Sequence, residues 1–174
     1  LTNAQIRAQV SGYLVKQEYR NGAFVKTGEP LFLVDPRPLQ AALEKSNGQL
    51  AVAIGQVAQA NGEVEKAKGD LERAKAELGR TEIDVRRLTP LAKDGSVSQQ
   101  ELDNAVQANL AAKGLVAAAE ASIVAAKSVV IASEANVVAA KAQVSESELN
   151  VGFTKILSPI DGIAGIAQVQ LGDL

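Results

Sequence analysis

Two reactive residue types are missing from this chain, since none of its 174 residues is a cysteine or a histidine. Without thiolates or imidazoles, the usual zinc sites, disulfides, cysteine nucleophiles and histidine-based triads are excluded. An enzyme would have to act through carboxylates, lysine or serine alone. The lack of cysteine fits a reducing cytosol and also a periplasm without structural disulfides, so it does not decide between them.

An excess of charge of one sign and long apolar runs are missing as well. The 18 basic and 20 acidic residues give a formal net charge of −2, and no basic block is present to attract nucleic acid or an anionic membrane, so neither partner is expected. Apolar stretches such as residues 31–34 and 129–132 are far shorter than the roughly 20 residues of a membrane span, so none is expected. Polar residues follow Leu1 directly, which is not the pattern of a signal peptide.

Both ends of the sequence have β character. Within residues 1–35, residues 6–10 alternate apolar and polar side chains, and residues 31–34 are continuously apolar. These patterns predict a half-exposed strand and a buried strand. Residues 153–174 repeat this character, with a period-two run at Ile166, Gln168 and Gln170. Because neither end is long enough for a core of its own, we expect the two to pair into one β-sandwich.

The middle of the sequence, residues 36–152, has the heptad period of a coiled coil. In its first part the a positions are large, namely Leu43, Leu50, Val57, Val64, Leu71, Leu78 and Val85. The d positions are mostly small, namely Ser46, Ala53, Ala60, Ala67, Ala74, Thr81 and Leu88. After a short break the same code resumes, with a positions Leu102, Asn109, Val116, Ile123, Val130, Val137 and Val144. Its d positions are again small, namely Ala105, Ala112, Ala119, Ala126, Ser133, Ala140 and Ser147. Small d residues let two helices approach closely, and the short break predicts an antiparallel hairpin.

Capping residues mark the ends of the two helices. Asp35 can cap a helix with Pro36 at its first position, and Pro90 is expected to kink or end that helix. Ser98 begins a capping box with Glu101. The expected segments are a first helix at about 36–91, a tip at about 92–97 and a second helix at about 98–151.

The charged residues of the first helix do not form a catalytic pattern. Acidic residues precede basic ones by three positions, as in Glu63 before Lys66 and Glu72 before Lys75. This spacing is typical of ion pairs on a helix surface. We expect no catalytic residues, no metal site and no cofactor.

Two series of residues lie outside the a and d positions, which form the predicted contact surface, or seam, between the two helices. In the first helix, Gly48, Gly55, Gly62 and Gly69 recur at the f position, where each costs roughly 1 kcal/mol relative to alanine. In the second helix the b position is apolar, including Leu110, Val124, Ile131 and Val138. One interpretation is compositional drift in an alanine-rich helix. Our hypothesis is that hairpins pack side by side, with the glycine face of one against the apolar b face of the next.

Three pieces of the sequence carry a family resemblance, namely residues 22–28 leading to 33–36, residues 154–162, and the hairpin tip. With them the chain resembles periplasmic adaptor proteins, also called membrane fusion proteins, of tripartite efflux pumps. The resemblance implies an α+β fold in which a long antiparallel coiled-coil α-hairpin is inserted into a split lipoyl-like β-sandwich. Residues 1–35 would be the first half of that domain, residues 36–152 the hairpin, and residues 153–174 a truncated second half. The continuation over residues 163–166 is most similar to adaptors of resistance-nodulation-division transporters.

The resemblance also implies a function and partners. The chain would be a non-catalytic periplasmic subunit, anchored to the inner membrane in the full-length protein, that bridges an inner-membrane transporter and an outer-membrane channel for drug or solute export. The transporter would be of the resistance-nodulation-division type, and the adaptor would form a trimer or hexamer in the assembled pump.

The tip matches the family pattern at Arg87, Leu88, Leu91 and Ser98. In the family the corresponding arginine, second leucine and serine contact the channel, so the resemblance implies that role for Arg87, Leu91 and Ser98. Local structure offers another interpretation of each. Arg87 would favour a helix C-terminus, Leu91 could close the seam, and Ser98 could be an N-cap.

Other function classes remain open at this point. Lipoyl-like domains elsewhere carry a modified lysine on a tight turn, which makes an acyl or biotin carrier an alternative, although Lys16, Lys26 and Lys155 lie in or near predicted strands. An adaptor of an ABC or major-facilitator export system is another. A coiled-coil scaffold without a channel partner is the third.

Overall fold

The structure, a computed structural model, describes residues 4–167 and divides into two compact units. One unit contains both β segments together with the helix residues up to Val52 and from Val137, and the other spans Ala53–Asn136. Two helices run through these units, α1 (Arg37–Lys93) and α2 (Gln99–Gly152). The β segments together with the roots of both helices therefore form one compact body.

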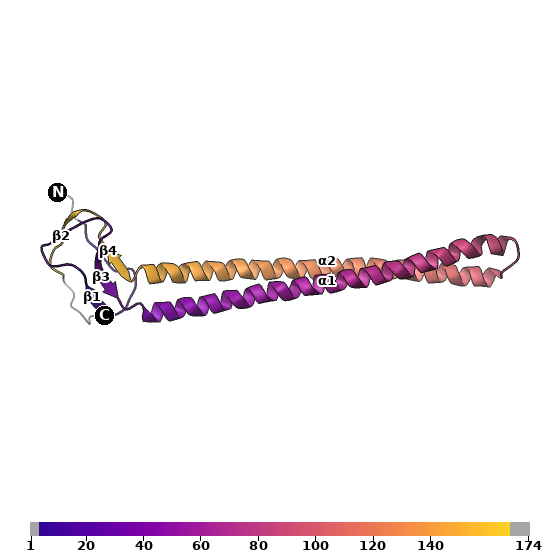
Figure 1. Cartoon of the computed structure of the whole chain (residues 1–174), viewed down its shortest axis with the longest axis horizontal. Coiled ribbons are helices and arrows are strands. Elements are labelled where there is room, and N and C mark those ends of the chain that lie inside the picture. Colours follow the sequence, from indigo (N-terminus) through magenta and orange to yellow (C-terminus); the bar gives the residue numbers. More distant parts are fainter. Residues whose placement is uncertain (1–3, 168–174) are drawn as a thin grey trace. The chain divides into compact units, whose positions relative to one another are not determined.

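Five short strands form two small antiparallel sheets in the first unit. They are β1 (Leu14–Gln17), β2 (Phe24–Val25), β3 (Pro30–Val34), β4 (Lys155–Leu157) and β5 (Gly162–Ile163). The strand order is β1-β3-β4 in one sheet, whose strands are labelled in Figure 1, and β2-β5 in the other. In each sheet a strand that precedes the hairpin pairs with one that follows it, as in Leu33 with Lys155 and Phe24 with Ile163. The expected pairing of the two ends of the chain is therefore confirmed.

The core of this unit is small. Val25, Leu31 and Val34 are its buried apolar residues, and Thr154 is 1% exposed. The Val34 N–H donates to the Thr154 carbonyl at 2.9 Å, and the Thr154 hydroxyl donates to the Val151 carbonyl at 2.6 Å. Because Thr154 lies just after α2, these bonds attach the end of that helix to β3.

One predicted strand is wrong. Residues 6–10 alternate as a strand should, but they do not form a strand in the structure, and Ile6 is exposed. The physical reason is the lack of a partner, because β1 is the edge of its sheet and no described strand pairs with its free side. The later run at Ile166, Gln168 and Gln170 lies mostly outside the described residues, and Ile166 itself is not in a strand.

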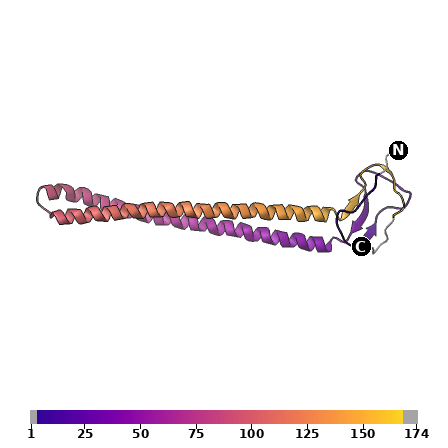
Figure 2. The ribbon, with the colours of Figure 1, turned by 180° about the vertical axis from the view of Figure 1, so that it is seen from behind.

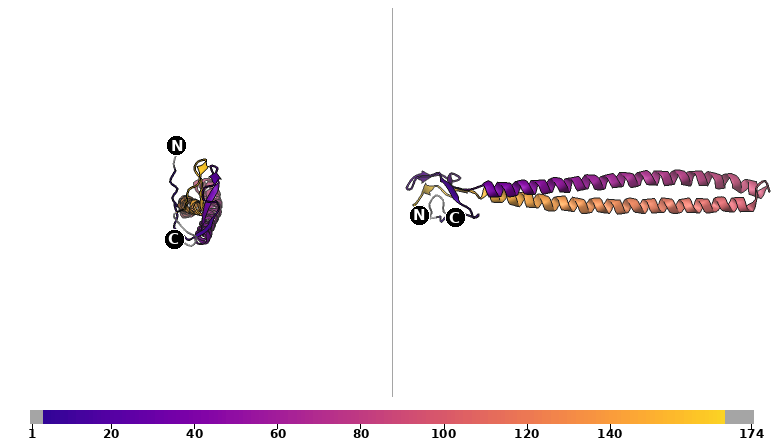
Figure 3. Two further views of the ribbon diagram at one scale, coloured as in Figure 1. Left: turned by 90° about the vertical axis from the view of Figure 1, so that its left-hand side faces the viewer. Right: turned by 90° about the horizontal axis from the view of Figure 1, so that it is seen from below.

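The heptad prediction is confirmed in the helices. Every predicted a and d residue is buried or half-buried, with Ala60 at 4% and Ala112 at 2% exposure. Within Ala53–Asn136 the two helices run along each other, as Figures 1 and 2 and the right-hand view of Figure 3 show. Pro90 does not end α1, which continues to Lys93. A proline this close to the end of a helix costs less than one in the interior, because little of the helix follows it.

Helix α2 is more apolar overall than its short uninterrupted apolar runs suggest. It contains an 18-residue window of mean hydropathy 1.8, enough for a span by length and composition alone. The uninterrupted apolar runs were short because single charged residues, such as Glu120 and Lys127, separate them. The seam face of α2 packs against α1, which carries charged residues throughout its distal half. The apolar residues outside the seam are a surface that needs its own explanation.

Candidate functional site

The tip is a five-residue loop, Asp94–Ser98, between the two helices. Gly95 has a φ of 72°, a left-handed conformation that glycine adopts without strain. The Ser96 N–H donates to the Leu91 carbonyl at 2.8 Å and the Asp94 N–H to the Pro90 carbonyl at 3.1 Å. These bonds satisfy the last carbonyls of α1 and fix the shape of the loop.

Of the four tip residues predicted from the sequence, the structure places three at the surface around the loop. The Arg87 side chain is 66% exposed and Leu91 is 37% exposed. They are one helical turn apart and so share a face of α1. Ser98 is exposed at the start of α2, while Leu88 occupies a half-buried seam position. Leu88 therefore supports the tip from within.

Ser98 is an N-cap, as its position predicted. The Glu101 N–H donates to the Ser98 hydroxyl oxygen at 3.2 Å, which satisfies one of the free donors at the start of α2. The capping bond holds the start of α2 in place, and Ser98 remains exposed to solvent.

Arg87 is the last member of a ladder of ion pairs along α1. The pairs at (i,i+3) spacing are Glu63 with Lys66, Glu65 with Lys68, Asp70 with Arg73, Glu72 with Lys75, Glu77 with Arg80 and Asp84 with Arg87. This confirms that these carboxylates are surface partners. The hydrogen bond from Arg80 lowers the pKa of the Glu77 carboxyl. Pairs this exposed contribute little stability, so their main effect is to orient the side chains.

The off-seam series are exposed in the structure. A Cβ atom built on Gly48, Gly55, Gly62 or Gly69 would meet nothing within 4 Å. On α2, Leu110 is 55% exposed, Val124 66%, and Ile131 and Val138 67% each. Leu115 and Val129 add to this apolar surface at 57% and 56%. An apolar face of this length is unusual on an isolated soluble helix.

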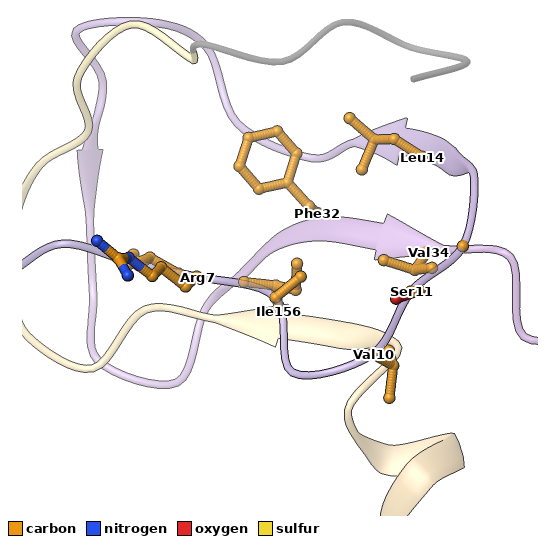
Figure 4. A pocket seen from close by; sticks show the side chains of 10 residues that line it. Arg7, Val10, Ser11, Leu14, Phe32, Val34 and Ile156 are labelled. Carbon is orange, nitrogen blue, oxygen red and sulfur yellow. The ribbon is translucent and has the colours of Figure 1, made fainter. Parts of the chain in front are cut away.

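A hollow of about 550 Å³ lies in the β unit (Figure 4). Leu14, Phe32, Val34 and Ile156 line it from β1, β3 and β4, and residues 6–12 close its other side. Among the described residues of its lining, Arg7 is the only charged one. Among residues 4–167 no three acidic residues gather as a metal site would require. Within residues 4–167, the lining therefore offers neither a nucleophile with a base nor a set of metal ligands.

The two halves of the β unit are joined by a polar contact that the sequence did not reveal. The Thr27 N–H and hydroxyl both donate to Asp161 Oδ1, at 2.6 and 2.9 Å. The Gly28 N–H donates to the Ser158 carbonyl at 2.7 Å, and the Ser158 N–H returns a bond to the Glu29 carbonyl at 2.9 Å. The bonds from Thr27 lower the pKa of the Asp161 carboxyl.

This contact gives a pH-dependent prediction. Since the folded pKa of Asp161 is lowered, its stabilising effect is complete above the unfolded value, near 3.8, and is lost as the pH falls through the folded value. We expect Asp161→Asn to lower the urea midpoint of the β unit at about pH 6 and to differ less from the parent protein at about pH 3. Near-ultraviolet circular dichroism of Tyr19, which packs edge-on to Phe32, is the measurement. An equal difference at both pH values would contradict it.

The sequence of this chain matches a known family and known relatives. A family model described as the barrel-sandwich hybrid domain of RND membrane fusion proteins matches residues 2–174. The multidrug resistance protein MdtA of Pantoea ananatis is 30% identical over 168 residues, which are 97% of this chain and 31% of that protein. The multidrug export protein AcrE of Escherichia coli is 28% identical over 171 residues, which are 98% of this chain and 34% of that protein.

The comparison with solved structures finds a similar fold. The crystal structure of MacA from Actinobacillus actinomycetemcomitans superposes with a TM-score of 0.59 at 24% identity, covering 99% of this chain and 44% of that one. The hairpin joined to a small β unit is therefore a fold already seen in another protein. The chain spans about a third of the length of the curated relatives it matches.

Proposed function

The chain belongs to the membrane fusion protein family of resistance-nodulation-division (RND) pumps, whose barrel-sandwich hybrid domain it matches, and from this membership we propose that it is the part of a periplasmic adaptor that docks on an outer-membrane channel. The full-length protein would be anchored to the inner membrane and would bridge an RND transporter and that channel in multidrug export. The β unit would be the split lipoyl-like domain of such an adaptor, and the chain would have no enzymatic role.

One observation carries this proposal, namely the arrangement of the tip. Arg87, Leu91 and Ser98 are exposed around a loop that backbone bonds, a cap and a glycine at positive φ hold in one shape. A planar cation, an apolar side chain and a hydroxyl on a fixed loop suit recognition of a partly polar, partly apolar protein surface. The hollow in the β unit offers no comparable set of groups.

The experiment is capture of the full-length protein from cells whose envelope has been cross-linked. We expect two membrane proteins to copurify, an inner-membrane transporter and an outer-membrane channel. A transporter of the ABC or major-facilitator type would replace the RND assignment while leaving the adaptor role. Recovery of no channel would contradict the proposal. Intact mass after coexpression with lipoyl and biotin ligases tests the carrier alternative, which an added group would favour.

We further propose that adaptor copies associate side by side in the pump, as a trimer or hexamer. The open glycine face of α1 allows a neighbouring backbone to approach closely, because nothing occupies the space above Gly48, Gly55, Gly62 and Gly69. The exposed b face of α2, with Leu110, Val124, Ile131 and Val138, would be the apolar surface that fills it. Such packing would remove from water a surface that otherwise favours aggregation.

The dual role of Ser98 gives a further prediction. Ser98→Ala removes the cap and should cost about 1 kcal/mol of helix stability, and it should also weaken channel binding. Ser98→Asp is the matched control, because aspartate caps as well as serine does but brings a charge to the tip. Thermal unfolding and channel binding are measured together. If Ser98→Asp restores stability and full binding, Ser98 is a cap with no contact of its own.

A further inference from the structure

Five positions of this chain place an asparagine or an aspartate directly before a glycine. Such a side chain can react with its own backbone, because glycine has no Cβ atom to hinder the approach of its nitrogen. The structure describes all five steps, namely Asn21-Gly22, Asn47-Gly48, Asn61-Gly62, Asp94-Gly95 and Asp161-Gly162. Which of them reacts depends on how the fold holds each backbone.

The reaction is a rearrangement that needs no reagent other than water. The glycine nitrogen attacks the side-chain carbonyl carbon, an N–C bond forms, and aspartic acid loses water or asparagine loses ammonia. The resulting five-membered succinimide then takes up one water molecule. Opening on one side gives aspartate, and opening on the other gives isoaspartate, in which the main chain runs through the side-chain Cβ atom. From aspartate, the water lost equals the water regained, so the product is an isomer of the parent.

Two of the five steps are held by helix α1. Asn47 and Asn61 are exposed, so burial does not protect them. Both lie inside α1, however, where the N–H of the following glycine is bonded to the carbonyl four residues earlier. Attack on the side chain would require this helix to open in its interior. The helix therefore protects both asparagines.

Two further steps are held by contacts between the two halves of the β unit. The Gly22 N–H donates to the Ala164 carbonyl at 2.8 Å. Asp161 Oδ1 accepts bonds from the Thr27 N–H and hydroxyl, at 2.6 and 2.9 Å, and Gly162 lies in β5. Either reaction would first have to separate the two halves locally.

The fifth step, Asp94-Gly95, lies in the tip loop and is held least. Both residues are exposed, and a Cβ atom built on Gly95 would meet nothing within 4 Å. Among residues 4–167, no hydrogen bond or ion pair engages the Asp94 carboxylate. The Gly95 N–H donates to the Ala92 carbonyl at 3.2 Å, a longer bond than that of Gly22. Because exposed loops open more readily than packed strands or helix interiors, this step reaches the reactive geometry most often.

We infer that Asp94 is a self-modification site, at which the tip loop converts to isoaspartate as the protein ages. The acid form of the Asp94 side chain is the reactant, the Gly95 nitrogen is the nucleophile, and water is the leaving group. This chemistry depends on the loop alone and needs no partner protein.

Isoaspartate at this position would change the shape of the tip. It adds one atom to the main chain between the two helices. The bonds from the Gly95 and Ser96 N–H groups to the Ala92 and Leu91 carbonyls span the added atom, so both should weaken. Leu91 precedes that atom and Ser98 follows it, so the distance between their side chains should change. The loss of channel binding expected from this change rests on the proposed function.

The test is ageing of the purified full-length protein in a neutral buffer, once in the native state and once in guanidinium chloride. A methyltransferase specific for isoaspartate counts the modified sites. Digestion with a protease that cleaves before aspartate but not before isoaspartate locates them, since the cut before Asp94 should be lost. Intact mass distinguishes this isomerisation from deamidation, which changes the mass.

The order of conversion should reverse between the two states. In guanidinium chloride the three asparagines should convert first, because ammonia leaves more readily than water at neutral pH. In the native protein Asp94 should convert first, because the fold holds the asparagine steps and leaves the loop open. Its isoaspartate content should rise with time at unchanged mass.

The matched variant is Asp94→Glu, which keeps the charge and the exposure. Its longer side chain would have to close a six-membered ring, which forms much more slowly, so the isoaspartate signal at this position should fall to background. Helical circular dichroism should match that of the parent. After ageing, the parent should lose channel binding in proportion to its isoaspartate content, while the variant should retain binding.

Two results would overturn the inference. One is an intact Asp94 in native protein aged for a time that converts the unfolded protein. The other is earlier conversion of an asparagine in the native state, because the fold would then not select the site. Equal loss of channel binding by the aged variant would refute the effect on docking. If isoaspartate forms at Asp94 and channel binding is unchanged, docking through the tip is wrong and the modification site stands.

Discussion

Arg87→Asp should abolish binding of the full-length adaptor to its channel and raise drug susceptibility to that of cells lacking the adaptor. The Arg87 guanidinium is exposed and oriented by Asp84, whose Oδ1 lies 2.9 Å from the arginine Nη2. Reversing the charge removes a planar five-donor group and places a second carboxylate beside Asp84. The stability cost should be small, about 0.5 kcal/mol, because the pair is at the surface. Channel cross-linking and drug susceptibility are the measurements.

Arg73→Asp is the matched control for this prediction. Arg73 occupies the same heptad position two heptads earlier and is paired with an aspartate three residues before it, as Arg87 is. The control therefore suffers the same local electrostatic change away from the tip, and it should retain channel binding and export. Wild-type binding by Arg87→Asp would contradict the role of Arg87, and equal loss in both variants would show a general effect of charge.

Cysteines at Gly55 and Ile131 should form disulfides between adaptor copies in the assembled pump. Gly55 lies on the open face of α1, and Ile131, 67% exposed, lies on the apolar face of α2 at a similar height along the hairpin, because Thr81 of α1 is bonded to Asn109 of α2. If the two faces pack together, cross-linked multimers should form at high protein concentration and in cells, and should disappear on dilution. Denaturing gels without reductant give the measurement.

The control for lateral packing is a pair within the seam. Cysteines at Ala67 and Ile123 should form a bond within one molecule at every concentration. Cysteines at Gly55 and Ala135 form a second control, because Ala135 is exposed on α2 at the same height but away from the b positions. If Gly55 and Ile131 give no bond between molecules while the seam pair bonds normally, side-by-side packing through these faces is wrong.

The seam and the cap could be predicted from the sequence because each depends on local spacing. Heptad series placed residues such as Ala60 and Ala112 in the seam, and the spacing of Ser98 and Glu101 predicted the cap. The strand at residues 6–10 was predicted wrongly, because alternation reports that a segment can pair but not that a partner is present.

Other features depend on contacts between residues that are far apart in the sequence. The contact of Thr27 with Asp161 joins residues 134 positions apart, and nothing in the sequence relates them. Asn109 is different, since a polar residue at an a position is visible in the sequence. Its partner Thr81 and their common burial follow only from the register, which the structure supplies.

The most direct test of channel docking is photo-cross-linking at Leu91 in the full-length protein in living cells. A photoreactive amino acid there should yield one major adduct with the outer-membrane channel, since Leu91 is exposed beside the loop. The same amino acid at Ala58, exposed on α1 more than thirty residues earlier, should yield no channel adduct. A channel adduct from Ala58 and none from Leu91 would contradict docking through the tip.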